Sequence, residues 1–304
     1  MNFHKAGPRA AQQTDTRGPG TGAGTAFLFA LATIVSVLAL AATYYFFVRT
    51  TTGQFIDESA LVQADTIRGP AGRASTEFLD WLPVTSLVIA AVVVLFVTIV
   101  RRRWTAAGIA VAACVVANLA TQLLKEWFPD RPYRGVQTLE LNSLPSGHTT
   151  LAASAAAAVF LMVSPRWRPL VGFLGGTFAV ASGVSTLINQ WHRPADVMAA
   201  FLVVAAIMLP AGWLVLRTGK GWNAWDGYGG HWASSRLWVR LSGIAVVASA
   251  AVAAYALREV ILGMELTDST SSYFWAGTAM IAGTGYFAML AAVWLFSWAA
   301  RRRG

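Results

Sequence analysis

Three short polar segments of the sequence carry the residue types that phosphoryl transfer needs. The first holds Lys125 and Arg131. The second is Pro145-Ser146-Gly147-His148, and the third runs from Ser185-Thr186 through His192 to Asp196. Lysine and arginine supply fixed positive charge and hydrogen-bond donors for phosphate oxygens. The segments therefore predict a site that binds an anion.

The spacing within these segments suggests how each residue would act. His192 and Asp196 are four residues apart, so on a helix the carboxylate can hold one ring nitrogen and leave the other as a nucleophile. Ser146 and Gly147 stand where a helix begins, and free backbone N–H groups and the helix dipole favour an anion there. His148 would stand at the rim, placed to give or take a proton. This is the set that phosphoryl transfer without a metal requires.

Each segment also has an ordinary explanation when it is taken alone. The Lys125–Arg134 region fits a solvated loop, Ser146 fits a helix cap, and His192 with Asp196 fits a structural pair. Their occurrence together on one face of a membrane favours a single site. The one cysteine, Cys114, excludes a disulfide framework and a cysteine-based zinc site. We therefore expect no metal and no cofactor.

The elements that must position these residues are membrane-spanning helices. Of the 304 residues, 56% are hydrophobic and 12% are charged, against about 25% charged in a soluble domain, which excludes a single soluble domain. A span needs roughly 20 apolar residues. Eight stretches reach or approach that length: Ala26–Val48, Val84–Val100, Trp104–Leu124, His148–Val163, Leu170–Ile188, Val197–Leu216, Leu241–Leu257 and Phe274–Ala300. We predict an all-α polytopic membrane bundle of about eight transmembrane helices, with the short, Ala-rich fourth span inside it.

The distribution of basic residues predicts the orientation. If the N-terminus is cytoplasmic, the inside loops and tails collect 15 of the 23 Lys and Arg residues and only two of the 14 acidic residues. We therefore expect a multi-pass cell-membrane protein with both termini cytoplasmic and the three polar segments extracytoplasmic. Topology accounts for the net charge of +9, so no nucleic-acid partner is expected. The sequence does not indicate any protein partner.

The chain divides into four parts on this interpretation. Residues 1–25 are expected to be a disordered cytoplasmic tail, residues 26–216 a membrane domain, residues 217–240 a cytoplasmic Trp/Gly-rich loop, and residues 241–304 two additional transmembrane helices without an assigned role. The Gln54–Leu82 stretch mixes charged and apolar residues. It is expected to form a short amphipathic helix lying at the outer interface.

The three polar segments resemble the signature of the type 2 phosphatidic acid phosphatase superfamily, the lipid phosphate phosphatases. That signature is Lys-x6-Arg-Pro, Pro-Ser-Gly-His and Ser-Arg-x5-His-x3-Asp. The second element matches fully. Two positions depart from it: five residues rather than six separate Lys125 from Arg131, and Thr186 replaces the second arginine. The resemblance covers Lys125–Asp196 by motif and about residues 80–216 by helix layout, and it implies a six-helix phosphatase core.

The resemblance also implies a mechanism. His192 attacks the phosphorus and forms a phosphohistidine, Asp196 orients His192, and His148 protonates the leaving oxygen and then activates water. The phosphoryl oxygens would be held by Lys125, Arg131 and the backbone amides of Ser146 and Gly147. Thr186 would donate one neutral hydrogen bond. Arg193 is the nearest candidate to replace the missing arginine, and Arg134 is the next.

The expected substrate is a lipid phosphate that reaches the site from the surrounding membrane lipids. The Ala-rich composition is typical of bacterial membrane proteins and favours a polyprenyl substrate, such as undecaprenyl phosphate or diphosphate, over phosphatidate-type lipids. Two alternatives stay open: a non-catalytic membrane protein of the same fold, such as a lipid carrier or assembly partner, and a phosphotransferase. The apolar spans argue against a soluble vanadate-dependent haloperoxidase.

Overall fold

The computed structural model describes residues 22–137, 142–218, 222–225, 227–262 and 272–300. These residues form helices and no strand. In chain order the helices are α1 (Ala23–Arg49), α2 (Thr51–Gln63), α3 (Asp65–Arg101), α4 (Trp104–Trp127), α5 (Gly147–Met162), the 3-10 helix η1 (Pro165–Trp167), α6 (Arg168–Ile188), α7 (Pro194–Arg217), the 3-10 helix η2 (Trp232–Ser234), α8 (Arg236–Ala256), α9 (Arg258–Ile261) and α10 (Ser272–Ala300).

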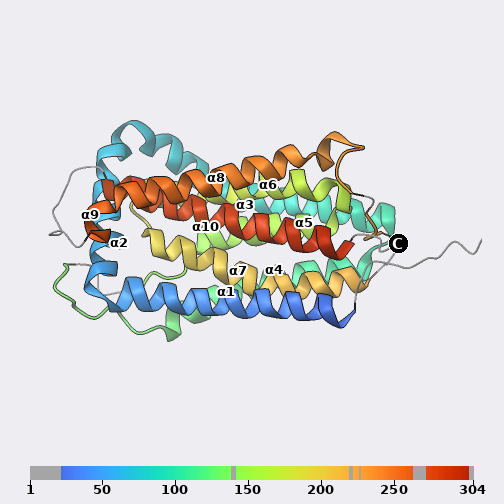
Figure 1. The fold of residues 1–304 in the computed structure, drawn as a ribbon, viewed down its shortest axis with the longest axis horizontal. Helices are drawn as coiled ribbons and strands as arrows, with labels where there is room; N and C mark the ends of the chain where they lie inside the picture. The colour runs from blue at the N-terminus through green and yellow to red at the C-terminus, as the bar shows by residue number, and fades with distance from the viewer. Residues whose placement is uncertain (1–21, 138–141, 219–221, 226, 263–271, 301–304) are drawn as a thin grey trace, which may run out of the picture.

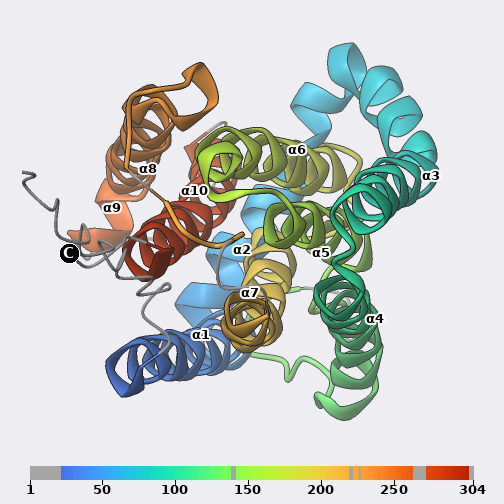
Figure 2. The same ribbon diagram turned by 90° about the vertical axis from the view of Figure 1, so that its right-hand side faces the viewer.

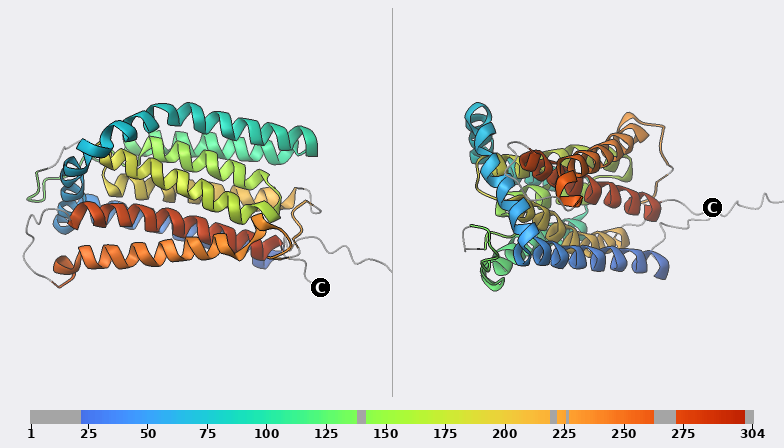
Figure 3. Two further views of the ribbon diagram at one scale, coloured as in Figure 1. Left: turned by 90° about the horizontal axis from the view of Figure 1, so that it is seen from above. Right: turned by 60° about the vertical axis from the view of Figure 1, so that its left-hand side comes forward.

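The predicted spans all coincide with helices. Within the described ranges, seven helical segments are long and apolar enough to cross a membrane, and the remaining predicted span is α5, with 16 residues. This confirms an all-helical, multi-pass membrane fold. The long helices lie side by side, and α1 begins at the same end of the bundle at which α10 finishes (Figures 1 and 3).

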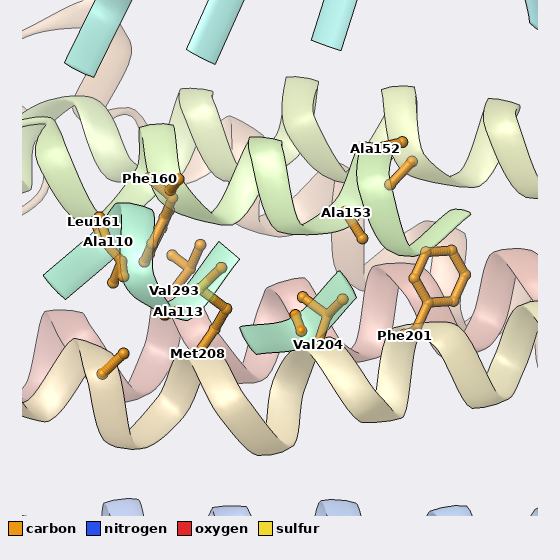
Figure 4. Packing of buried hydrophobic residues seen from close by; sticks show 14 of the residues in the cluster. Ala110, Ala113, Ala152, Ala153, Phe160, Leu161, Phe201, Val204, Met208 and Val293 are labelled. Atoms are coloured by element: carbon orange, nitrogen blue, oxygen red, sulfur yellow. The ribbon is translucent and has the colours of Figure 1, made fainter. Parts of the chain in front are cut away.

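The centre of the bundle is formed by α5 and α7 (Figure 2). Helix α7 contacts α1, α4, α5 and α10, and α5 contacts α3, α4, α6 and α7. Small buried residues of α5, among them Ala152 and Ala153, let these neighbours approach closely. Side chains from α4, α5, α7 and α10 fill the space between them (Figure 4). The prediction that the fourth span is short and packed inside the bundle is therefore confirmed.

The two helices that the sequence left without a role differ in their packing. Helix α8 is largely exposed and packs mainly on α10, whereas α10 also contacts α2, α6 and α7. Gly277 of α10 brings the backbone against the start of α7: a Cβ there would lie 2.6 Å from Pro194 Cγ and 3.0 Å from Ala60 Cβ. Helix α10 is thus part of the bundle that surrounds the third polar segment.

The expectation of one interfacial helix over Gln54–Leu82 is wrong. Helix α2 ends at Gln63, and α3 begins at Asp65 and continues without a break to Arg101. Polar residues near the start of α3 instead form hydrogen bonds with the end of α6 and the residue that follows it. Ser75 Oγ donates to the Ser185 carbonyl over 3.0 Å, and Thr76 Oγ1 donates to Asn189 Oδ1 over 3.0 Å.

The predicted cytoplasmic segments are only partly described. Helix α1 begins at Ala23, so the last residues of the expected 1–25 tail are helical. Residues 1–21 of that tail, and residues 219–221 and 226 of the expected 217–240 loop, lie outside the described residues. The division of the chain into four parts stays a prediction.

Candidate active site

The three polar segments meet at one end of the bundle. Lys125 lies in the last turn of α4, Gly147 and His148 open α5, and Thr186 lies near the end of α6. Asp196 lies in the first turn of α7. Neighbouring helices run in opposite directions, so the end of one span and the beginning of the next reach the same side. This is the end of the bundle that also carries α2 (Figure 1).

His192 and Asp196 form a direct pair. His192 Nδ1 lies 3.2 Å from Asp196 Oδ2, and the Asp196 carboxylate is fully buried. Ser143 Oγ donates to the same oxygen over 2.6 Å, and the Arg193 backbone N–H donates to it over 3.1 Å. A carboxylate on Nδ1 favours the tautomer that carries its proton there. The Nε2 lone pair is then left for a reaction.

The turn before His192 is held by backbone hydrogen bonds. The N–H groups of Trp191 and His192 donate to the Thr186 carbonyl over 2.9 and 3.3 Å. Gln190 has a φ of 58°, in the left-handed region. Its side-chain amide donates to the Leu61 carbonyl of α2 over 3.1 Å. Contacts from α2 and α3 therefore fix the direction in which His192 leaves α6.

His148 stands at the second position of α5, close to His192. It is close enough to His192, Lys125 and Asp80 to interact with their charges. Its ring centroid lies 5.4 Å from the ring centroid of Trp191. The two histidines of the predicted mechanism are therefore close to each other.

The start of α5 forms an anion-binding turn together with α4. The Gly147 and His148 amides belong to the first turn, where backbone N–H groups have no partner inside the helix. A Cβ at Gly147 would lie 3.9 Å from both Lys125 Nζ and Gln122 Nε2. The ammonium and amide groups of α4 thus end beside the open turn. Gln122 was not predicted from the sequence, although it shares a helix face with Lys125 three residues later.

The backbone amide of Ser146 was expected to bind phosphoryl oxygens, but it has a different partner. Its backbone N–H donates to the Asp196 carbonyl over 2.8 Å, so it is not a phosphate donor in this structure. Its Oγ caps α5 by accepting from the Thr149 N–H over 3.5 Å. Ser146 joins the second polar segment to the third, and the amides of Gly147 and His148 remain as donors.

Arg131 was expected to bind phosphate, but here it lies inside the protein. The residue is 3% exposed. Its Nη2 lies 2.8 Å from Asp57 Oδ2 and 3.8 Å from Asp196 Oδ1, and its Nη1 donates to the Phe47 carbonyl over 3.4 Å. Burial alone lowers its pKa, but the Asp57 and Asp196 carboxylates raise the pKa of Arg131 above its ordinary value. The guanidinium is therefore charged and committed to internal carboxylates.

Thr186 and Arg193 are also engaged away from the open turn. Thr186 is fully buried, and its Oγ1 donates to the Gly183 carbonyl over 2.7 Å. Arg193 Nε donates to Glu58 Oε2 over 2.7 Å, and its Nη1 donates to Ser143 Oγ over 3.3 Å. Both side chains therefore have partners inside the protein. Arg134 is exposed in the loop after α4.

The carboxylates of α2 are the main feature that the sequence did not reveal. Asp57 binds Arg131, and its Oδ1 accepts from the Ala195 N–H over 2.9 Å. Glu58 binds Arg193. Burial and the charge of Asp196 outweigh the attraction of Arg131 and raise the pKa of Asp57 from 3.8 to about 6. Helix α2 thus ties the first polar segment to the start of α7.

Comparison with known proteins identifies the family of this region. The family model of the PAP2 superfamily matches residues 120–220. A search of curated proteins and a search of solved structures found no match. The matched range contains Lys125, the start of α5 and the His192–Asp196 pair, which are the residues brought together at one end of the bundle. Residues 120–220 of this membrane protein therefore form a PAP2 superfamily domain.

Proposed function

We propose that this protein is a lipid phosphate phosphatase that works through a phosphohistidine. The observation that carries the proposal is the His192–Asp196 pair beside the open first turn of α5 and Lys125. Asp196 holds Nδ1 of His192 at 3.2 Å. The other ring nitrogen, Nε2, is the nucleophile. The phosphoryl oxygens are bound by Lys125 and by the amides of Gly147 and His148, with Gln122 as a further neutral donor.

The reaction has two steps, and His148 acts as the proton donor in the first and as the proton acceptor in the second. In the first, Nε2 of His192 bonds to phosphorus while the bond from phosphorus to the leaving oxygen breaks, and His148 gives that oxygen a proton. In the second, His148 takes a proton from water, whose oxygen attacks phosphorus and releases phosphate from His192. Metal-independent chemistry stays a prediction, and activity in the presence of a chelator checks it.

A lipid substrate is supported by the depth of the site. Trp127 is 79% exposed and lies two residues after Lys125, and Trp191 is 43% exposed and directly precedes His192. Exposed tryptophans in a membrane protein collect at the headgroup level. These two exposed tryptophans therefore support a site at the depth of a lipid phosphate. We propose an extracytoplasmic site in the cell membrane, and a polyprenyl phosphate or diphosphate such as the undecaprenyl lipids before phosphatidate-type lipids.

Phosphate release by the purified protein tests this proposal. The panel is undecaprenyl diphosphate, undecaprenyl phosphate and phosphatidate in mixed micelles. His192→Ala should abolish release, and His148→Ala should slow it and let labelled phosphohistidine accumulate from a labelled substrate. Full activity of His192→Ala would refute the mechanism. Transfer of the label to an added alcohol, without phosphate release, would indicate a phosphotransferase.

A non-catalytic role in lipid binding is the second candidate, and one observation favours it. Arg131, Thr186 and Arg193 all have internal partners, so few charged donors remain at the open turn. Binding of a panel lipid by wild type, with no turnover and no phosphohistidine in His148→Ala, would select this role.

A further inference from the structure

Two buried arginines lie at the opposite end of the bundle from the candidate active site. Arg103 directly precedes α4 and is 8% exposed, and Arg168 begins α6 and is 2% exposed. Helix α4 has 24 residues, so the two ends are roughly 36 Å apart at 1.5 Å per residue. In the part of the chain that the structure describes, neither guanidinium is paired with a carboxylate. An unpaired buried charge is expensive.

The two arginines converge on one segment after α7. Arg168 Nη2 donates to Asn223 Oδ1 over 2.9 Å, and Arg103 Nη2 donates to the Thr218 carbonyl over 3.3 Å. Asn223 Nδ2 also donates to the Thr218 carbonyl over 3.2 Å, which joins the two. The two positive charges are close enough to repel each other. Burial lowers the pKa of Arg103 to about 10, so it is still charged at neutral pH.

Several donors of this cluster have no acceptor. Arg103 Nη1, Arg168 Nε, Arg168 Nη1 and Trp222 Nε1 are buried without a hydrogen-bond partner among the described residues. The Trp222 ring lies against the cluster, with its centroid 5.3 Å from the Arg103 guanidinium carbon. The positive ends of the α4 and α6 dipoles lie at this same end of the bundle. The cluster has donors and positive charge, so what it lacks is an oxyanion.

We propose that Arg103, Arg168 and Trp222 form a second anion site, which binds a phosphate-type oxyanion. Two sources share this chemistry: the headgroup phosphate of an anionic phospholipid in the leaflet at this end, and free phosphate. Bound there, the anion compensates the guanidinium charges and supplies an acceptor to buried donors that have none among the described residues. It also locks the α3–α4 turn to the segment that follows α7.

Thermal unfolding of the purified full-length protein in detergent tests the site. One arm adds sodium phosphate against sodium chloride at equal ionic strength. The other adds phosphatidylglycerol against phosphatidylcholine in mixed micelles. Saturating anion should raise the midpoint by about 2–4 °C or more. A higher thermal midpoint in the sodium phosphate arm identifies free phosphate as a ligand. A higher midpoint in the phosphatidylglycerol arm, with none in the sodium phosphate arm, identifies the lipid headgroup.

Variants assign the response to this cluster. Arg168→Met and Arg103→Gln should each lose the rise, and without added anion Arg168→Met should be at least as stable as wild type, because an uncompensated buried charge is gone. Arg166→Gln removes the same charge from an exposed position two residues away and should keep the rise. The proposal is overturned if wild type shows no rise. It is also overturned if both cluster variants keep the rise, since the anion then binds elsewhere, such as at the α5 turn.

Discussion

Replacing Arg131 tests whether this residue acts in an internal ion pair or binds the substrate phosphate. Arg131→Met keeps the volume but leaves Asp57 and Asp196 buried without their shared cation. Removing one partner of a buried pair costs about 3–5 kcal/mol. At 1 kcal/mol for each 2–4 °C, a loss of about 3 kcal/mol lowers the thermal midpoint by roughly 6–12 °C. Arg134→Gln, an exposed arginine of the same loop, should change stability by less than about 0.5 kcal/mol.

The double variant Asp57→Asn/Arg131→Met distinguishes the role of Arg131 in the internal ion pair from a role in phosphate binding. It removes one stranded carboxylate together with the cation, so most of the lost midpoint should return. If Arg131 acts only inside the protein, kcat/KM for lipid phosphate should also return to within about tenfold of wild type. Loss of one oxyanion donor typically costs about 10²–10³ in rate. A double variant that is stable but still 100-fold slower would refute the reasoning and assign Arg131 to the phosphate.

Three further predictions concern the open turn, the pH dependence and the topology. Gly147→Ala places a methyl group beside Lys125 Nζ and should lower kcat/KM at least tenfold with an unchanged midpoint, whereas Gly108→Ala, with open space around it, should leave activity unchanged. The raised pKa of Asp57, about 6 instead of 3.8, means that the folded protein binds this proton more readily. The contribution of Asp57 protonation to the stability of the folded protein is therefore complete below about pH 4 and is lost as the pH rises through 6. Asp57→Asn should remove this part of the pH dependence of the thermal midpoint. Wild type and variant with the same dependence of midpoint on pH would contradict the prediction. A reporter fused after Gly304 should be active in the cytoplasm and one inserted in the 133–142 loop outside; activity of both on one side would exclude the eight-span topology.

The sequence was sufficient where the physical cause is local. Runs of apolar residues predict the spans because a helix must satisfy its backbone within the bilayer. The spacing of His192 and Asp196 predicted their contact, but the cause is not a shared helix face. His192 lies before α7, which begins at Pro194, and the Asp196 side chain reaches back past the first turn to the Arg193 N–H and to His192. The short fourth span could be placed inside the bundle because its residues are small.

The parts that could not be predicted depend on contacts between distant segments. Asp57 meets Arg131 across 74 positions of the chain, and Glu58 meets Arg193 across 135. The mixture of charged and apolar residues over Gln54–Leu82 resembles an interfacial helix, because the sequence does not show that Arg131 and Arg193 bind the Asp57 and Glu58 carboxylates. The same holds for Ser146, whose amide is occupied by a carbonyl 50 residues later.

The close approach of Gly277 to Pro194 has a consequence for biosynthesis. Helix α10 is translated after α2 and α7, yet its backbone lies against the residue that opens α7 and against Ala60 of α2. The Phe274 N–H also donates to Gln63 Oε1 at the end of α2 over 3.0 Å. During insertion, residues 120–220 are therefore synthesised before α10, which supports the start of α7. The candidate site is therefore complete only when α10 has packed against α2 and α7, so a chain truncated before α10 would carry every motif and still lack this support.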